Sequence, residues 1–315
     1  MHVIGVFNRD GGTFKTTDMD AFAARAVEVF TAHGHTLAAR IVEGKELIAE
    51  LNRAGSEGPD MLLAGGGDGT ISAAAAVAYK QHIPLGVLPA GTMNLFARSL
   101  KIPLDLNAAL EALAIGEVRD VDIATANGRP FIHQFSVGIH PKLVKLRETL
   151  SYKSRIGKMI ASTRAAAGVI LKPPNFRVDV TTKRGLQRRL TAGLSVSNNP
   201  FEEGHIPHAE GLDAGLLGIY IVKPLSPWVL AKLCFAVIRG NWKSAPVVID
   251  REAKEVTMRF PSKKSSAVAV IDGELIKLAD TVELKIRPGA LKVVVPHVAE
   301  VTPANTADAA LTAAQ

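Results

Sequence analysis

The chain has 315 residues, of which 47% are hydrophobic and 21% are charged, a composition typical of a globular protein with a full core. A chain of this length predicts about two domains, and it contains no apolar run approaching the roughly 18 residues that a membrane-spanning helix needs. The first residues, MHVIGVFNRDGG, lack the basic, apolar and cleavage regions of a secretory signal. Because the single cysteine, Cys234, also allows no internal disulfide, we expect a cytoplasmic protein.

The charge of the chain favours anionic partners. Lys and Arg outnumber Asp and Glu by 37 to 30, which gives a net charge of +7 at pH 7. The basic residues cluster at 142–158 and 181–190, whereas only 5% of residues are aromatic, which is few for a surface that stacks on nucleic-acid bases. We therefore expect phosphate groups or an anionic membrane surface as partners and no nucleic acid. Solubility alone is the other explanation of this charge.

Strand-like and helical patterns alternate through residues 1–122. Near-continuous apolar runs predict strands, and between them apolar residues recur at helical spacing, as Met19, Phe22, Ala26 and Phe30 do. The predicted strands span 2–8, 36–42, 60–66 and 84–90, and the predicted helices span 18–33, 45–54, 71–81 and 106–116. This alternation predicts an α/β domain with a parallel sheet that is covered on both faces.

The pattern changes after residue 122. Asn127-Gly128 lies between two strand-like runs, which indicates a hairpin, and short alternating runs with turn residues between them follow. They predict a β-rich antiparallel sandwich at 123–295. One apolar helix interrupts it at 227–239, and we expect its Cys234 and the flanking Trp228 and Trp242 to pack inside. An interfacial position near lipid is the alternative for the two tryptophans. Residues 296–315 form a small, polar C-terminal segment whose end we expect to be disordered.

The stretch LLAGGGDGTIS, residues 62–72, places three glycines and an aspartate at a strand-to-helix junction. Glycines let the backbone approach a ligand closely, and the first N–H groups of the following helix form a seat for phosphate. The candidate phosphate-binding residues are Gly65, Gly66, Gly67, Asp68, Gly69 and Thr70, and Asp68 is also a candidate magnesium ligand. The Lys-Ser/Thr pair of a Walker A loop is absent. A tight turn capped by Asp68 is the alternative.

Two further turns follow predicted strands of the same sheet. PAGTMN, residues 89–94, places Gly91, Thr92 and Asn94 before a helix, and NRDGGT, residues 8–13, places Asn8 and Thr13 after the first strand. Because neighbouring parallel strands end on the same side of a sheet, these residues should share one crevice with the glycine turn. A common turn without a ligand is the alternative for PAGTMN.

A third candidate element lies far downstream, in AVAVIDGELIKL at 267–278. Asp-Gly between two alternating runs predicts a β-hairpin turn. Asp272 and Glu274 then place two carboxylates at the tip of the β-rich domain, where a carboxylate can accept a proton from a hydroxyl nucleophile. A hairpin turn without chemistry is the alternative.

Together these motifs resemble the diacylglycerol kinase catalytic-domain superfamily. Gly-Gly-Asp-Gly-Thr, then Pro-x-Gly-Thr-x-Asn followed by LFAR, then a distant Asp-Gly-Glu, is the pattern of bacterial soluble lipid kinases, which are related to sphingosine and ceramide kinases. The resemblance spans essentially the whole chain. It implies an N-terminal α/β nucleotide-binding domain, a C-terminal β-sandwich for the lipid substrate, and a cleft between them where ATP meets a lipid hydroxyl.

The resemblance also implies roles for matching residues. Gly66 to Thr70 and Thr92 would bind the phosphates of ATP, Asn94 would shape that site, and Asp68 would organise Mg²⁺. Glu274 would be the general base, with Asp272 beside it. The basic stretch at 152–170 would line the lipid entrance. The expected protein is then a cytoplasmic enzyme of phospholipid metabolism that associates peripherally with the membrane.

Two departures from the family pattern matter. Arg9 stands where the family's opening turn has proline, which weakens the expected nucleotide contact at Asn8. Bacterial relatives also carry a structural magnesium site at an Asp-Gly-Leu turn, where this chain has Ala214, with Asp213 one place early. We therefore do not predict that ion.

Two other functions remain open at this point. NAD kinase-like enzymes share Gly-Gly-Asp-Gly and a similar two-domain layout, and a non-catalytic nucleotide- or lipid-binding module would need no chemistry. The sequence favours a lipid kinase, because GTMNLFAR and the Asp-Gly-Glu hairpin have a role only there. Which lipid is phosphorylated is left open, as is the oligomeric state, a homodimer included.

Overall fold

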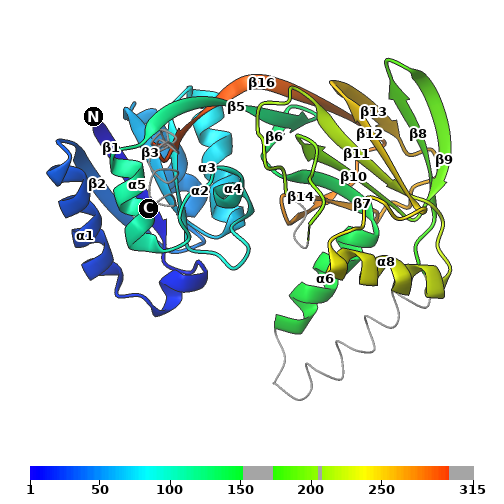
Figure 1. Ribbon diagram of the computed structural model, residues 1–315, viewed down its shortest axis with the longest axis horizontal. Helices are drawn as coiled ribbons and strands as arrows, with labels where there is room; N and C mark the ends of the chain where they lie inside the picture. Colours follow the sequence, from blue (N-terminus) through cyan, green and yellow to red (C-terminus); the bar gives the residue numbers. More distant parts are fainter. Residues whose placement is uncertain (152–172, 205–207, 298–315) are drawn as a thin grey trace, which may run out of the picture.

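The computed structural model describes residues 1–151, 173–204 and 208–297 (Figure 1). The basic cluster expected at 142–158 lies partly outside these residues. The expected lipid entrance at 152–170, and the C-terminal segment from residue 298, lie wholly outside them.

The N-terminal half is the predicted α/β domain. Four strands lie in the order β2-β1-β3-β4, and every neighbouring pair is parallel. The elements are β1 (His2–Asn8), η1 (Gly12–Thr16), α1 (Met19–Ala32), β2 (Thr36–Val42), α2 (Leu47–Ser56), β3 (Met61–Gly66), α3 (Asp68–Gln81), β4 (Leu85–Pro89), α4 (Leu95–Ser99) and α5 (Leu106–Ala114). The predicted strands and helices are confirmed, with ends that differ by three residues or fewer at each position.

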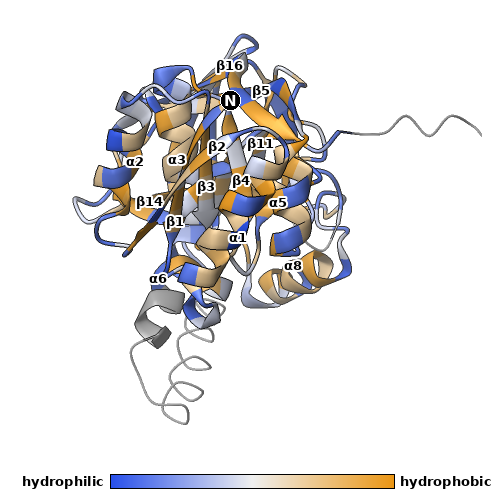
Figure 2. Ribbon diagram, turned by 90° about the vertical axis from the view of Figure 1, so that its left-hand side faces the viewer, coloured by the Kyte–Doolittle hydropathy of each residue, from blue (hydrophilic) through white to orange (hydrophobic). Residues whose placement is uncertain are grey.

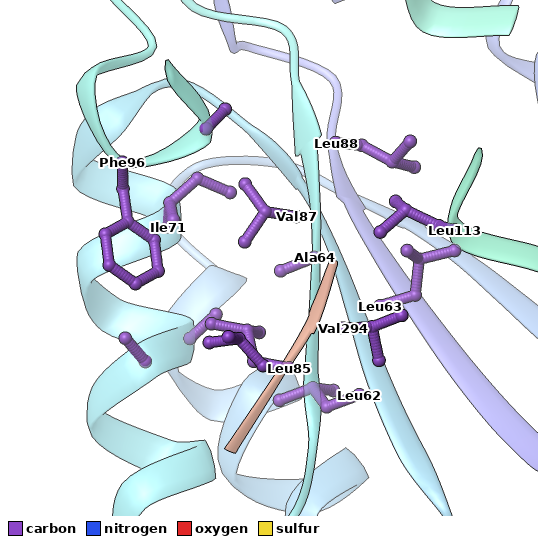
Figure 3. Close-up of a cluster of buried hydrophobic side chains, with 14 of the residues drawn as sticks. Leu62, Leu63, Ala64, Ile71, Leu85, Val87, Leu88, Phe96, Leu113 and Val294 are labelled. Carbon is purple, nitrogen blue, oxygen red and sulfur yellow. The ribbon is translucent and has the colours of Figure 1, made fainter. Parts of the chain in front are cut away.

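The core of this half lies on both faces of the sheet. Every residue of β3 and β4 is buried, as expected for parallel strands that helices cover on both sides. Figure 3 shows Ala64 and Leu85 from these strands packed among side chains of α3, α5 and a later strand, including Ile71, Leu113 and Val294.

The C-terminal half is the predicted antiparallel sandwich. One sheet has six strands in the order β12-β11-β10-β7-β14-β15. The second is formed by β5, β6, β8, β9, β13 and β16, and the two inner faces enclose one apolar cluster. The elements are β5 (Glu117–Ala126), β6 (Arg129–Phe131), β7 (Gln134–Gly138), α6 (Ile139–Ser151), β8 (Phe176–Thr182), β9 (Gly185–Thr191), β10 (Gly193–Asn198), β11 (Leu217–Val222), α8 (Pro227–Arg239), β12 (Val248–Ala253), β13 (Glu255–Arg259), β14 (Val268–Ile271), β15 (Glu274–Lys277) and β16 (Thr281–Val295).

Two long strands, β5 and β16, run from one half into the other (Figure 1). The start of β16 pairs with β13 in the sandwich, whereas Val293 near its end pairs in parallel with Leu85 of β4. Residues 291–295 are buried in the N-terminal core, apart from Lys292. The expected boundaries placed all of β16 in the second domain. In the structure the end of β16 lies next to β4, which has β3 as its neighbour on the other side. This end of the strand therefore completes the sheet of the first domain.

Both predicted Asx-Gly hairpins are present. Asn127 and Gly128 have φ of 48° and 80°, and Asp272 and Gly273 have φ of 46° and 87°. Each pair forms a two-residue loop, between β5 and β6 and between β14 and β15. Positive φ at both positions is the geometry of a type I′ turn, which asparagine or aspartate followed by glycine tolerates best.

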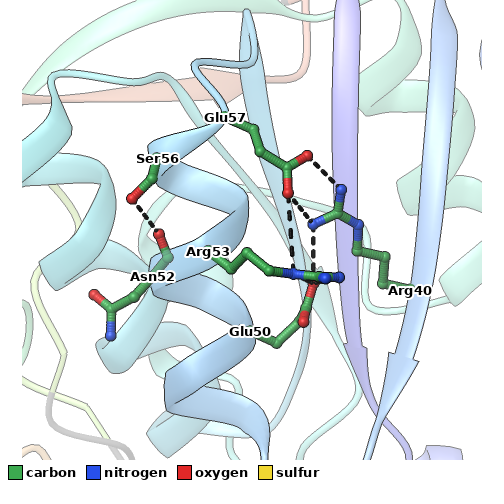
Figure 4. Close-up of polar contacts among 6 residues, drawn as sticks. All are labelled: Arg40, Glu50, Asn52, Arg53, Ser56 and Glu57. Carbon is green, nitrogen blue, oxygen red and sulfur yellow. Dashed lines mark hydrogen bonds and ion pairs between the residues drawn. The ribbon is translucent and has the colours of Figure 1, made fainter.

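A network of ion pairs joins α2 to β2 at the sheet edge (Figure 4). Arg40 contacts Glu50 at 2.9 Å and Glu57 at 2.5 Å, and Arg53 contacts Glu50 at 2.9 Å. Burial raises the pKa of Glu50, but the hydrogen bonds from Arg53 and Arg40 outweigh it, so that this pKa is lowered. The network holds α2 on the sheet, and none of its four residues lines the cavity between the two halves of the chain.

The apolar helix is present as α8, but its expected packing is only partly confirmed. Trp242 is buried, whereas Cys234 is exposed and 71% of Trp228 is exposed. The expectation failed for these two residues because only one face of α8 lies against the sandwich, and Leu230 is its one buried residue. No helix among the described residues is long and apolar enough to cross a membrane.

Candidate active site

Three turns meet at the carboxyl edge of the parallel sheet, after β1, β3 and β4. Ala90 donates its backbone N–H to the carbonyl of Gly66 at 3.0 Å, and Thr13 donates its own to the carbonyl of Ala90 at 2.8 Å. The predicted convergence is therefore present, because parallel strands deliver all three turns to one side.

The glycines of two turns touch each other. A Cβ atom on Gly91 would lie 2.7 Å from the Cα of Gly67, closer than real Cβ contacts allow. Gly65 and Gly66 are buried in β3, where a Cβ would meet Phe7 and Phe14 or the side chain of Thr70. Packing thus accounts for these glycines, and their contact with a phosphate stays a prediction.

Replacing Gly91 with alanine is expected to lower the free energy of unfolding by about 1–3 kcal/mol, because the added methyl group forces two backbones apart. Chemical denaturation measures this. Gly69→Ala is the matched control, since nothing lies within 4 Å of its added Cβ. It lies inside α3, where alanine should leave stability unchanged or raise it by up to about 1 kcal/mol. Equal losses in both variants would contradict the close approach.

The N-terminus of α3 is open toward the turns. Gly67 is its N-cap and supplies no side-chain hydrogen bond, so the first N–H groups are available to an anion. Thr70 is buried, and its hydroxyl accepts a hydrogen bond from Asn8 Nδ2 at 3.0 Å. Asn8 and Thr70 therefore connect β1 to α3, and Thr13 is exposed.

Asp68 and Asn94 link the second and third turns. One carboxylate oxygen of Asp68 accepts the N–H of Asn94 at 3.1 Å, and the other accepts the N–H of Leu95 at 2.7 Å. Asn94 has φ of 50°, and its side chain both accepts from and donates to the backbone of Gly91. Asp68 thus caps α4, a contact that the sequence did not reveal.

A cavity of about 570 Å³ lies between the two halves of the chain. It brings together many of the predicted residues, and its lining includes Gly67, Asp68, Gly69, Gly91 and Thr92 from the N-terminal half, and Asp272 and Glu274 from the hairpin. The other predicted residues, which do not line it, are Asn8, Thr13, Gly65, Gly66, Thr70 and Asn94. The distant Asp-Gly-Glu motif therefore faces the glycine turns across one cleft.

Asp272 holds the hairpin tip in place. Its carboxylate accepts the Ser72 hydroxyl of α3 at 2.6 Å and three consecutive backbone N–H groups, those of residues 132–134, at 2.9–3.0 Å. Burial raises the pKa of Asp272, and the four hydrogen bonds oppose that rise. Asp272 therefore connects the hairpin to α3 in the N-terminal half and to residues 132–134 in the C-terminal half.

Glu274 is exposed at the cleft and forms an ion pair with Arg129. Arg129 Nη2 lies 2.5 Å from Glu274 Oε2, with side chains that are 46% and 65% exposed. An exposed pair of this kind contributes about 0–1 kcal/mol to stability. The ion pair thus orients the carboxylate beside the cavity, where it is accessible to a hydroxyl group bound there.

His133 lies on the wall of the cavity and stacks on Phe201, with ring centroids 4.9 Å apart. Loss of hydration by burial lowers the pKa of His133 to about 4, although the negative charge of Asp68 acts to raise that pKa. The imidazole is therefore neutral at pH 7.

This lowered pKa predicts a pH-dependent stability. Between pH 6.5 and about pH 4 the unfolded chain takes up a proton at His133 and the folded chain does not. The free energy of unfolding should therefore fall by about 3 kcal/mol as the pH decreases through this window. In denaturation experiments the free energy of unfolding of His133→Gln should decrease by about 3 kcal/mol less than that of the wild type over this pH range. His33→Gln, at an exposed position, should show the full decrease. Parallel profiles for wild type and His133→Gln would contradict the assignment.

Several residues of the site were not found by sequence reasoning. Ser72 lies one helical turn after Asp68 on α3, a spacing that could have indicated it. Arg129 directly follows the Asn-Gly hairpin, and His133 and Gln134 follow β6. Their contacts join distant segments, so no local pattern signals them.

The residues present are compatible with Mg²⁺ at Asp68. No cluster of three or more His, Cys, Asp or Glu residues that could hold a metal occurs among the described residues. Mg²⁺ is commonly held by one or two carboxylates together with the phosphates of a substrate, and Asp68 lines the cavity.

The separate structural magnesium of bacterial relatives was not predicted for this chain. At the corresponding place Asp213 is exposed, and the buried carboxylate of Asp122 instead accepts the N–H groups of Gly215 and Gly289.

Comparison with known proteins identifies the class to which this fold and site belong. The family model of the diacylglycerol kinase catalytic domain matches residues 2–126. A diacylglycerol kinase of Staphylococcus aureus is 31% identical over 233 residues, which cover 71% of this chain and 71% of that protein. The chain therefore belongs to the diacylglycerol kinase family, a family of kinases, and the predicted resemblance is confirmed.

Two further comparisons found similar proteins. An uncharacterized protein of Synechocystis sp. is 26% identical over 272 residues, which cover 81% of this chain, and the chain spans 60% of that protein's length. The crystal structure of a diacylglycerol kinase from Bacillus anthracis superposes with a TM-score of 0.68 at 18% identity, covering 94% of this chain and 97% of that one. At this identity the superposition shows that the two chains share the fold.

Proposed function

We propose that the protein is an ATP-dependent lipid kinase that transfers the γ-phosphate to the hydroxyl of diacylglycerol or a related lipid. The observation that carries this proposal is the cavity in which the glycine turns, with Asp68, face Glu274 across the two halves. A phosphate seat opposite an exposed carboxylate is what phosphoryl transfer to a hydroxyl needs.

The chain's own residues would divide the work of such a transfer. The free N–H groups at the start of α3, with Gly91 and Thr92, would bind the nucleotide phosphates. Asp68 would hold Mg²⁺, which neutralises phosphate charge when it is bound. Glu274 would accept the proton of the lipid hydroxyl as that oxygen attacks the γ-phosphorus and ADP leaves.

A second cavity supports a lipid as the acceptor. It measures about 750 Å³ and opens at the end of the sandwich beside the start of α6. Its lining combines apolar side chains, among them Val137, Phe176, Phe260 and Leu278, with the cations Lys142, Arg177, Lys263 and Lys264. Apolar walls with cations at the same opening suit acyl chains and a polar or anionic head group.

The test is transfer of labelled γ-phosphate from ATP·Mg²⁺ to a panel of lipids in mixed micelles, with NAD as an additional acceptor. Asp68→Ala should abolish transfer, whereas Asp20→Ala, at an exposed carboxylate on α1, should retain it. Label in one lipid class that is lost in Asp68→Ala supports the proposal and names the substrate. Label on NAD would replace it with an NAD kinase-like function, and tight ATP binding without transfer to any acceptor would replace it with a binding module.

A further inference from the structure

The outer face of α8 is apolar and exposed. Trp228, Phe235 and Ile238 are 71%, 58% and 69% exposed, although ten of the thirteen residues in PWVLAKLCFAVIR are apolar non-proline side chains. The helix α3 has a similar length and buries six residues, whereas α8 buries one, Leu230. Figure 2 shows the apolar segments of α8 on the surface at the lower right of the molecule.

Cations are interleaved with these aromatic side chains. Lys232 Nζ lies 5.8 Å from the centre of the Trp228 ring, and the Arg239 guanidinium lies 5.6 Å from that of Phe235. The helix contains no Asp or Glu. Aromatic residues alternating with cations on an exposed helix are the composition of an interfacial helix that lies on an anionic bilayer.

The opposite face of α8 fixes its position relative to the cleft. Leu230 packs with Leu225 and Ala192, and Ile139 at the start of α6 packs against the same cluster. The same helix α6 lines the cavity between the two halves through His140 and Val144. Figure 1 shows α8 beside α6. A surface that held α8 would therefore also lie near the wall of that cavity.

We propose that the outer face of α8, defined by Trp228, Lys232, Phe235 and Arg239, docks on the surface of an anionic lipid bilayer. The inference rests on the proposed function, since a bilayer is where its lipid acceptor is found. Charge distinguishes the bilayer from a second copy of the chain. Two identical faces in contact would bring like charges of Lys232 and Arg239 together, whereas anionic head groups neutralise both.

Tryptophan fluorescence of the full chain tests this directly, because Trp228 is exposed and the only other tryptophan, Trp242, is buried. Phosphatidylcholine vesicles that contain phosphatidylglycerol should shift the emission to shorter wavelength, and added salt should reduce the shift. Trp228→Phe should still bind these vesicles but show no shift, because Trp242 does not change its surroundings. No shift in the wild type, or an equal shift in Trp228→Phe, would overturn the proposal.

Sedimentation with the same vesicles measures the binding itself. Trp228→Ser/Phe235→Ser should weaken binding at least about tenfold, since two large apolar contacts with the bilayer are lost. Lys232→Gln/Arg239→Gln should weaken it about fivefold for each removed cation, and only when phosphatidylglycerol is present. The control is Ile48→Ser/Ile115→Ser, which removes apolar side chains that are 57% and 58% exposed on the N-terminal half. A control that loses as much binding as the α8 variants would overturn the proposal.

Failure of docking is distinguishable from failure of the proposed function. The vesicle experiments contain no ATP and measure no transfer. Phosphorylation of a water-dispersed short-chain diacylglycerol should be equal in Trp228→Ser/Phe235→Ser and the wild type, which shows that the variant is folded. If the variant instead converts a dimer into a monomer in size-exclusion chromatography and binds vesicles normally, the face is an interface between copies and the proposal is wrong.

Discussion

Replacing Asp272 with alanine is expected to lower the free energy of unfolding by about 3–5 kcal/mol, because four hydrogen-bond donors lose one acceptor at once. Three of these donors are consecutive backbone N–H groups, and the fourth is the Ser72 hydroxyl in the other half of the chain. Phosphate transfer should fall as well, since the hairpin that carries Glu274 is released from α3. Chemical denaturation and steady-state transfer, measured on the same preparations, give both quantities.

Two variants isolate the cause of this loss. Ser72→Ala removes one donor and leaves three hydrogen bonds, so its cost should be only about 0.5–1.5 kcal/mol. Asp280→Ala removes a carboxylate that is 86% exposed and should change stability by no more than about 0.5 kcal/mol. If Asp272→Ala were no less stable than Asp280→Ala, Asp272 would not join the two halves.

Replacing Glu274 with glutamine is expected to lower kcat by about 10²–10⁴, the usual effect of removing a general base. Glutamine keeps the shape of the side chain and cannot accept the proton of the lipid hydroxyl. The affinity for ATP should be unchanged, because the proposed function places the nucleotide on the turns of the other half. Transfer assays at saturating lipid and a separate ATP-binding measurement test these two expectations.

The control for Glu274 is a second exposed glutamate. Glu255 begins β13 as Glu274 begins β15, and it does not line the cavity. Glu255→Gln should keep the wild-type kcat, and both variants should be as stable as the wild type within about 1 kcal/mol. A Glu274→Gln enzyme that retained kcat within a few-fold would assign the proton transfer to another group.

Local patterns were sufficient for most of the fold. The apolar runs of β1 to β4 and the helical spacing of α1 placed these elements close to their observed ends. The Asn-Gly and Asp-Gly pairs indicated their hairpins, because few other residues adopt two successive positive φ values. The glycine turns could be placed on one sheet edge for a similar reason, since strand direction alone determines where they meet.

Contacts between distant segments could not be predicted in the same way. Nothing near Asp272 in the sequence shows that Ser72, 200 residues away, donates to its carboxylate. The capping of α4 by Asp68 likewise depends on the exact spacing of two neighbouring turns. For α8 the composition correctly indicated an apolar helix, but only the arrangement of the sandwich determines that Trp228 is outside and Trp242 inside.

The strand β16 has a consequence for how the protein is made. Its last residues supply the neighbour of β4, yet they leave the ribosome after almost everything else that the structure describes. Until then β4 is an edge strand with unpaired backbone N–H and C=O groups, the kind of edge that other chains can join. The N-terminal half, although translated first, can therefore complete its sheet only after the sandwich has been translated.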